Sequence, residues 1–206
     1  MYLDSVFPRK GRLLDIGCAT GVFLDMARLD GWDVEGVEVS PELAAYAREK
    51  FSLNVHLLDL SKQPLGLGPF KVITMFDVIE HLPDARGMIT ACQKLLAPGG
   101  LLLIRTPTEE GLMRDVAKMV YWCSLKRVEL PMLWFYSFEH IQSFSLKSMR
   151  RLLEERRFSI LKIFREDESV ERLNIPLYVK YAVKGVNLCS SAVGKQHKVC
   201  VIAKSG

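Results

Sequence analysis

A tight turn of small residues with a carboxylate on each side is the part of this sequence best suited to chemistry. The turn runs from Gly17 to Gly21, Asp15 stands just before it, and Glu38 follows farther along the chain. Asp15 would repel a pyrophosphate at the turn, but it suits a ligand that carries an ammonium group. S-adenosylmethionine has an α-amine and a sulfonium and no phosphate. The alternative is a structural acid at a helix N-terminus. The pattern predicts an S-adenosylmethionine site.

The second carboxylate, Glu38, is placed to bind a ribose. An acidic residue roughly 20 positions beyond a glycine turn accepts hydrogen bonds from ribose hydroxyls in nucleotide-binding folds. Its neighbour Val39 belongs to the same expected contact with the adenosine. Within the turn, Gly17, Ala19 and Gly21 are expected to keep the backbone open, so that the methionine part of the ligand can approach closely.

The segments around these residues predict an α/β fold. Strands are expected over 12–16, 33–39, 54–58, 71–76, 101–105, 158–164 and 197–204, with helices over 20–29, 41–50, 84–96, 145–156 and 173–193. Strands that alternate with helices form a parallel sheet covered on both faces, and right-handed crossovers bring the carboxyl ends of the first, second and fourth strands to one edge. We therefore expect one domain over 1–206, a Rossmann-like, doubly wound, seven-stranded sheet.

Several motifs follow one another in a consistent order along the chain. They are Leu14-Asp15-Ile16-Gly17-Cys18-Ala19-Thr20-Gly21, Val37-Glu38-Val39-Ser40, Asp77-Val78-Ile79-Glu80-His81-Leu82-Pro83-Asp84, Leu95-Leu96-Ala97-Pro98-Gly99-Gly100, and Glu139-His140 followed by Phe144-Ser145. In these motifs the chain resembles the class I S-adenosylmethionine-dependent methyltransferases over nearly its whole length. It is most similar to the ubiquinone-biosynthesis O-methyltransferases and other small-molecule methyltransferases. The resemblance implies a mostly parallel sheet whose last strand enters antiparallel beside the sixth.

The chain departs from the family pattern at three positions. Ala19 and Arg157 stand where glycine is usual, and Lys71 stands where an aspartate usually opens the fourth strand. An alanine is tolerated in the turn if its φ angle is negative, because glycine alone enters the left-handed region freely.

The resemblance also implies further contacts to the cofactor. Asp59 follows the third strand, where the family binds adenine, so its carboxylate would accept a hydrogen bond from the exocyclic amine while Leu60 packs on the ring. A turn stabilised by the Asp59 side chain at the start of the loop is an equally good explanation. Phe76, at the end of the fourth strand, is expected to line the methionine side of the site.

His81 and His140 are the candidate catalytic bases. In methyl transfer the nucleophile attacks the sulfonium methyl in line, so alignment of the reactants matters most. A base is needed only for a poor nucleophile such as a phenol or an alcohol, and imidazole titrates near neutrality. His81 follows the fourth strand at the crevice edge, and His140 would face the substrate from the opposite side. Alternatively, Glu80 and His81 hold the loop together by hydrogen bonds.

A divalent metal is a third interpretation of the same segment. In the quinone-pathway relatives that it resembles, two acids and a histidine at these positions are implicated in metal binding. Asp77, Glu80 and His81 have the matching side chains, and one turn of backbone would bring them together around Mg²⁺ or Mn²⁺. Asp77 is shorter than the usual glutamate and no fourth ligand is evident, so we predict no metal site.

Composition bounds the class of protein. The chain has 206 residues, is 49 % hydrophobic and carries a net charge of +4, so it can bury one substantial core. Five cysteines without a CxxC pair indicate reduced thiols and argue against zinc, and Cys18 is expected to be a small residue that fits the turn. With no apolar leader, these features favour the cytoplasm. The basic residues gather after His140, as solvated helix faces or as a surface for an anionic partner.

Residues 107–139 are expected to form a lid-like insertion. They include a helix with apolar positions at helical spacing, Leu112, Met113, Val116, Met119, Val120 and Cys123, and an aromatic cluster, Trp134, Phe135, Tyr136 and Phe138. The cluster suits either a core or a flat, greasy acceptor. Helices over 110–125 and 173–190 could lie on a membrane surface with Lys118, Lys126, Arg127, Lys180 and Lys184 near headgroups, although ordinary packing is the better explanation. Relatives usually carry helices before the first strand that help to close the active site. Here residues 107–139 would close it, or the sequence is a shortened form, or a partner subunit, as in a homodimer, supplies the cover.

The predicted function is methyl transfer from S-adenosylmethionine to a small-molecule acceptor, most simply at oxygen. A non-catalytic S-adenosylmethionine-binding protein is one alternative. An RNA methyltransferase is another, which the basic C-terminal third permits but which lacks the Asn/Asp-Pro-Pro-Tyr/Phe signature and any RNA module. Nothing indicates a DNA partner. Asp15 and the absence of a GxGxxG turn disfavour an NAD-dependent oxidoreductase.

Overall fold

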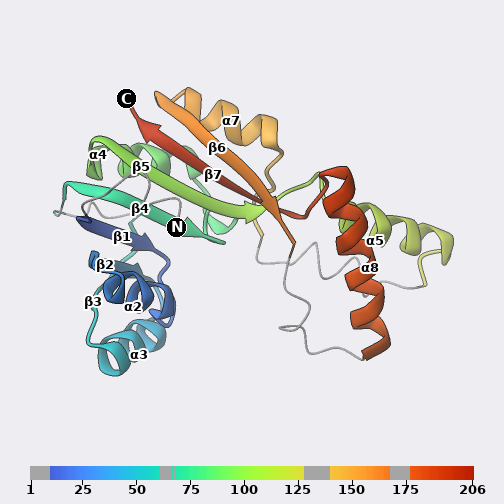
Figure 1. The fold of residues 1–206 in the computed structure, drawn as a ribbon, viewed down its shortest axis with the longest axis horizontal. Coiled ribbons are helices and arrows are strands. Elements are labelled where there is room, and N and C mark those ends of the chain that lie inside the picture. Colours follow the sequence, from blue (N-terminus) through green and yellow to red (C-terminus); the bar gives the residue numbers. More distant parts are fainter. Residues whose placement is uncertain (1–9, 61–65, 67, 128–139, 168–176) are drawn as a thin grey trace.

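The computed structural model describes residues 10–60, 66, 68–127, 140–167 and 177–206. Its strands are β1 (Arg12–Ile16), β2 (Asp33–Glu38), β3 (Asn54–Leu57), β4 (Phe70–Phe76), β5 (Leu96–Pro107), β6 (Phe158–Glu166) and β7 (Lys198–Ser205). They form one sheet in the order β3-β2-β1-β4-β5-β7-β6 (Figure 1). The pairs among β1 to β5 are parallel, and β7 runs antiparallel to both β5 and β6. The predicted fold class is confirmed, including the antiparallel last strand.

The helices lie close to their predicted positions. They are α2 (Val22–Leu29), α3 (Pro41–Phe51), α4 (Ala85–Leu95), α5 (Leu112–Cys123), α7 (Leu146–Glu154) and α8 (Leu177–Val193), with a short 3₁₀ helix η1 (Ile79–His81). Ser40 caps α3 by accepting from the backbone N–H of Leu43, with proline as the first helical residue, and Ser145 forms a capping box at the start of α7. β5 is longer than predicted at both ends, because Leu96 pairs with Phe70 of β4 and the residues after Arg105 continue to pair with β7.

Alternating side chains of the sheet build two separate layers of core. Leu14, Ile73 and Leu102 belong to one hydrophobic cluster with the buried faces of α4 and α7. The preceding residue on each of these strands, as in Leu13 and Val72, belongs to a second cluster with α2 and α3. Successive side chains of a strand point to opposite faces, so the sheet is covered by helices on both faces, as expected.

α5 and α8 lie beside each other beyond the carboxyl end of β5, away from α2 and α3 (Figure 1). The backbone N–H of Leu112 at the start of α5 donates to the carbonyl of Lys195, 2.7 Å away, just after α8. Among the described residues, no helix is long and apolar enough to cross a membrane. Glu139, most of the 60–70 loop and the aromatic cluster (Trp134, Phe135, Tyr136, Phe138) lie outside the described residues.

Candidate active site

The small-residue turn between β1 and α2 has a strongly curved backbone. Gly17, Ala19 and Gly21 all lie in the left-handed region, with φ angles of 72°, 47° and 79°. The N–H groups of Gly17 and Cys18 both donate to the carbonyl of Val37, at 2.8 and 3.1 Å, which ties the turn to β2. A side-chain carbon added at Gly17 would collide with Val78 of the loop after β4. Glycine is therefore required there by both backbone angle and space.

The φ angle of Ala19 corrects one expectation. It is positive, so a negative φ is not what accommodates the alanine, and the residue carries the left-handed cost of about 1 kcal/mol. Its N–H donates to Oε2 of Glu38 at 2.8 Å, which compensates part of that cost. Arg157 also has a positive φ of 59°. Both departures from the family pattern thus place a side chain where the backbone favours glycine.

Glu38 is buried and links the turn to the end of β2. Its Oε1 accepts from the N–H groups of Val39 and Ser40, at 2.8 and 2.9 Å, and its Oε2 accepts from that of Ala19. A carboxylate offers roughly four lone-pair positions. The three backbone contacts leave capacity on Oε2 for one ribose hydroxyl. A second hydroxyl would have to replace an existing contact.

Asp15 lies opposite Thr74 in the register of β1 and β4, and it is 4 % exposed. The Thr74 hydroxyl donates to Oδ1 of Asp15 at 2.6 Å. Burial raises the pKa of Asp15 to about 7; the hydrogen bond from Thr74 opposes this rise, and the nearby charge of Glu38 adds to it. The carboxyl group is therefore close to half ionised at neutrality, and a cationic group beside it would favour the ionised form.

The other predicted cofactor residues differ in how much surface they offer. Val39 is 64 % exposed at the end of β2, next to Glu38. Phe76 ends β4 and packs edge-to-face on Phe23, with ring centroids 5.0 Å apart. Asp59 is half-buried, whereas Leu60 is part of the hydrophobic core. Val39 therefore has more free surface for an adenine ring than Leu60, and all four assignments stay predictions.

The two candidate bases lie side by side although they are far apart in sequence. The N–H groups of Ile141 and Gln142 donate to the carbonyl of Glu80, at 2.9 and 3.0 Å, and so hold the segment that contains His140 against η1. The rings of His81 and His140 have centroids 4.9 Å apart. The loop before η1 also contacts the turn, because a side chain added at Gly17 would collide with Val78 of this loop.

Glu80 is the buried acid of this group, at 2 % exposure. The Thr106 hydroxyl donates to its Oε2 at 2.9 Å, whereas its buried Oε1 has no hydrogen-bond partner in the part of the chain that the structure describes. Burial raises the pKa of Glu80 above its ordinary value. One ligand atom each from Glu80, His81 and His140 lie within 4.8 Å of one another. The donor set is one carboxylate and two imidazoles.

The sequence suggested Asp77 as a companion of Glu80 and His81. In the structure His140 takes that place, and Asp77 is not part of the group. Its Oδ2 accepts from Arg105 at 2.6 Å and from Lys198 at 3.0 Å. Arg105 also lies over the ring of Phe76, 5.2 Å from its centroid. Neither Arg105 nor Lys198 was among the residues predicted from the sequence. Arg105 had a signal, because it is the one charged residue in the apolar run 101–107 at the end of a central strand.

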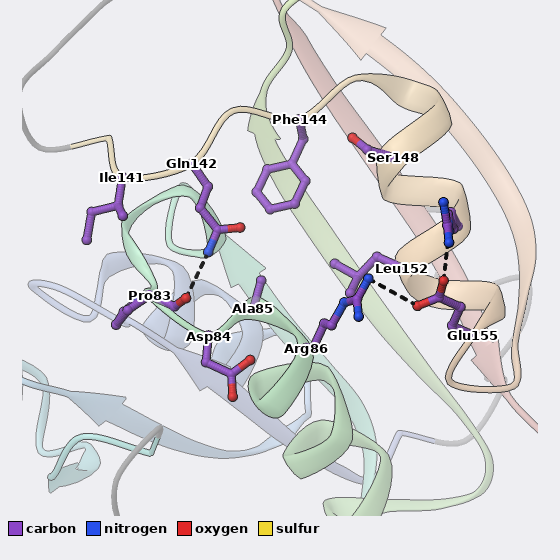
Figure 2. Close-up of a pocket in the computed structure, with 11 residues that line it drawn as sticks. Pro83, Asp84, Ala85, Arg86, Ile141, Gln142, Phe144, Ser148, Leu152 and Glu155 are labelled. Atoms are coloured by element: carbon purple, nitrogen blue, oxygen red, sulfur yellow. Dashed lines mark hydrogen bonds and ion pairs between the residues drawn. The ribbon is translucent and has the colours of Figure 1, made fainter.

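A hollow of about 660 Å³ lies beside this region, between the start of α4, the segment 141–144 and α7 (Figure 2). Glu155 makes ion pairs with Arg86 at 3.6 Å and Arg151 at 2.8 Å on its wall. Its described lining contains none of the predicted cofactor or base residues. This hollow is therefore distinct from the turn of Gly17 to Gly21.

Cys18, inside the turn, is not a reactive thiol. Burial, with the charges of Asp15 and Glu38, raises its pKa to about 12, so the thiol stays protonated at neutrality. A side chain at Gly36 would lie 2.6 Å from its sulfur, so the thiol packs directly against β2. This contact agrees with the expectation of a small residue that fits the turn.

The chain is similar to a known protein family and to individual known proteins. A family model described as a methyltransferase domain matches residues 2–163. The ubiquinone biosynthesis O-methyltransferase of Cereibacter sphaeroides is 37 % identical over 111 residues, which are 50 % of this chain and 44 % of that protein. The protein of the same name from Caulobacter sp. is 39 % identical over 103 residues, 46 % of this chain and 40 % of that protein. The match thus spans less than half the length of these relatives.

Solved structures share the architecture at low sequence identity. An S-adenosylmethionine-dependent methyltransferase from Archaeoglobus fulgidus superposes with a TM-score of 0.66 at 19 % identity, over 98 % of this chain and 91 % of that chain. Magnesium protoporphyrin IX methyltransferase from Synechocystis, solved with bound S-adenosylhomocysteine, has a TM-score of 0.64 at 14 % identity, over 100 % of this chain and 78 % of that chain. These likenesses show the fold.

Proposed function

The chain belongs to the methyltransferase domain family, whose cofactor is S-adenosylmethionine, and from this premise we propose that it transfers the cofactor's methyl group to a hydroxyl of a small molecule. One observation carries the proposal: Asp15 and Glu38 flank the left-handed turn of Gly17 to Gly21 at the carboxyl ends of β1 and β2. Two relatives that align with about half of this chain are named O-methyltransferases, which supports oxygen as the acceptor atom.

Each part of the cofactor has a matching group in this proposal. The ionised Asp15 attracts the α-ammonium group, and the remaining capacity of Glu38 Oε2 binds a ribose hydroxyl. Val39 and Asp59 are assigned to the adenine. Phe76 is assigned to the methionine side. The absence of a side chain at Gly17 lets the ligand lie against the backbone of the turn.

The pair of histidines is assigned to the acceptor. The acceptor oxygen attacks the sulfonium methyl in line, the bond from sulfur to methyl breaks, and S-adenosylhomocysteine leaves. The hydroxyl proton passes to the imidazole of His81 or His140. The buried carboxyl group of Glu80, within 4.8 Å of both rings by their nearest ligand atoms, would stabilise the imidazolium when ionised.

A metal-assisted version of the same reaction is the second candidate, favoured by the buried Oε1 of Glu80 that lacks a described hydrogen-bond partner. Glu80, His81 and His140 would hold the ion, and this mixed set suits Zn²⁺, Mn²⁺ or Fe²⁺ better than Mg²⁺. A bound divalent ion would supply Lewis acidity to the acceptor hydroxyl. In this version the two imidazoles would bind in neutral form, and the hydroxyl proton would be released to water because the ion lowers the pKa of the hydroxyl.

The test is release of S-adenosylhomocysteine from S-adenosylmethionine with a panel of catechols and phenols, before and after treatment with EDTA. Turnover that survives EDTA and is lost in His81→Ala supports the histidine base. Turnover lost on EDTA treatment and restored by Mn²⁺ or Zn²⁺ supports the metal. Tight cofactor binding without turnover on phenols, amines or RNA would favour a non-catalytic S-adenosylmethionine-binding protein and contradict the proposed transfer.

A further inference from the structure

Residues 141–144 connect His140 to α7 and run along one wall of the hollow (Figure 2). The end of this segment next to α7 is anchored by burial and by pairing, because Phe144 is 6 % exposed and forms a bridge with Thr108. The end next to His140 is not anchored by burial, because Ile141 is 62 % exposed. The position of the His140 ring therefore depends on the hydrogen bonds that hold this second end.

Gln142 supplies most of that hold, with its backbone and its side chain. Its backbone N–H donates to the carbonyl of Glu80 at 3.0 Å. Its side-chain Nε2 donates to the carbonyl of Leu82 at 2.5 Å and to that of Pro83 at 3.3 Å. Glu80 and Leu82 are the two neighbours of His81 in the chain. Gln142 thus binds the backbone on both sides of one histidine and follows the other by two residues.

The contact requires the donor end of the Gln142 amide. Backbone carbonyls only accept hydrogen bonds, so the NH₂ group must face Leu82 and Pro83, as it does in Figure 2. A glutamate at this position would have the same length, but its ionised carboxylate offers no donor and would repel both carbonyls. The side-chain type at position 142 is therefore matched to its partners.

The hollow makes these hydrogen bonds more important. It is bordered by Ile141, Gln142 and Phe144, whereas neither histidine lines it. Fewer protein atoms pack against the segment on the side of the hollow, so dispersion contacts contribute less to fixing it there. Hydrogen bonds to residues 80–83 remain as the main restraint from the described residues on the end next to His140.

We propose that Gln142 is a positioning residue, whose amide holds His140 beside His81 with the ring centroids 4.9 Å apart. This inference rests on the proposed function, in which the two imidazoles serve the acceptor. Gln142 acts through the histidines and takes no proton itself. In-line methyl transfer is sensitive to alignment, and a misplacement of about 1 Å can cost roughly 10²-fold in rate. In the metal-assisted version, the same hydrogen bonds would keep His81 and His140 together as ligands.

The first test is the kinetics of S-adenosylhomocysteine release in variants of position 142. Gln142→Ala and Gln142→Glu should each lower kcat by roughly ten- to a hundredfold and leave the KM for S-adenosylmethionine unchanged. Gln142→Lys restores N–H donors on a long side chain and should recover most of kcat. Ser143→Ala is the matched control, because Ser143 is the next residue of the segment, is exposed, and makes no hydrogen bond to the described residues.

The second test needs no acceptor. The nuclear Overhauser effect between the ring protons of His81 and His140 should be present in the wild type and in Ser143→Ala, and lost in Gln142→Ala and Gln142→Glu. If the wild type shows this signal and no variant or wild type turns over any acceptor, the proposed function fails while the positioning role is still measured. The two failures are therefore distinguishable.

Three results would overturn the proposal. The first is a wild type without the signal between the two rings. The second is a Gln142→Ala variant that keeps both that signal and the wild-type kcat. The third is a loss of kcat in Gln142→Ala that disappears at a lower temperature, where circular dichroism shows the variant fully folded, because Gln142 would then serve stability alone.

Discussion

The proposed cofactor side, around the turn of Gly17 to Gly21, and the proposed acceptor side, around Glu80 and the two histidines, are built from contacts of different range. On the cofactor side, the turn and Glu38 are held by backbone groups of β2 and the β1–α2 turn, and Asp15 has one side-chain partner from farther away, Thr74 of β4. On the acceptor side, Glu80 bonds to Thr106, the segment after His140 bonds to Glu80, and Lys198 reaches Asp77 from the last strand. The first side can be altered by local changes, whereas the second depends on how distant segments meet.

The largest expected effect separates the two sides by catalysis. His81→Ala and His140→Ala should each leave the affinity for S-adenosylmethionine unchanged, and the one that serves as base should lower turnover by roughly 10²–10⁴-fold. Release of S-adenosylhomocysteine and calorimetric titration measure the two properties. If turnover holds in both variants and only the melting temperature falls, the histidines have a structural role.

A pair of glycine substitutions contrasts the tight turn of the cofactor side with an open position on α8. Gly17→Ala adds a side chain at a positive φ and into Val78, so it should destabilise the fold by about 2–4 kcal/mol. Gly185→Ala meets nothing within 4 Å on α8 and should stabilise the protein by about 0.5–1 kcal/mol. Urea unfolding measures both. Equal midpoints for the two variants would refute the tight contact between the turn and the loop after β4.

The carboxylates of the cofactor side give the next effect. Asp15→Ala and Glu38→Ala should each weaken binding of S-adenosylmethionine by ~1–3 kcal/mol, the cost of leaving buried donors without their acceptor. Glu42→Ala is the control, because this nearby acid is exposed and accepts only from its helix-capping neighbour Ser40 among the described contacts. Calorimetry that finds unchanged affinity in both site variants would remove the assigned cofactor contacts.

The smallest effect is a pH dependence of cofactor affinity. The pKa of Asp15 is raised to about 7, so below that pH the carboxyl group is neutral and does not attract an ammonium group. Affinity for S-adenosylmethionine should fall by up to about tenfold per unit as the pH drops below 7. Asp15→Asn should flatten the profile. A wild-type profile that is level between pH 6 and 8 would contradict the contact.

The same shift predicts the stability of the free protein with the opposite sign. Between the ordinary pKa of an aspartate and about 7, the folded state holds a proton on Asp15 that the unfolded state has released. The contribution of this group to the free energy of unfolding therefore decreases as the pH rises from about 4 to 7. Comparing urea midpoints of the wild type and Asp15→Asn across this range isolates it.

The local signals explain why the cofactor side was predictable from the sequence. The order of strand, glycine turn and helix, together with the Ser40-Pro41 cap, depends on neighbouring residues and appears in the structure as expected. The negative φ angle expected for Ala19 was wrong. Its φ is positive in a turn where its N–H donates to Glu38 and where the preceding N–H groups donate to the carbonyl of Val37. The glycine that is usual here in the family would have indicated a positive φ, whereas alanine gives no such signal.

The acceptor side was only partly predictable, because its arrangement depends on pairing between distant strands. Both histidines were named, but the backbone bonds from Ile141 and Gln142 that bring them together have no signal in the sequence. Asp77 was grouped with Glu80 by spacing along one turn. In the structure its partner Lys198 arrives from β7, whose place beside β5 is set by the sheet.

Calorimetric titration of the wild-type protein with S-adenosylmethionine and S-adenosylhomocysteine, with NADH as the control ligand, tests the central claim most directly. Asp15 and Glu38 flank a turn that suits an adenosyl ligand with a cationic amine and lacks the spacing of a pyrophosphate loop. We therefore predict micromolar binding of both adenosyl ligands and no heat from NADH. Binding of NADH, or no binding of either adenosyl ligand, would contradict the account.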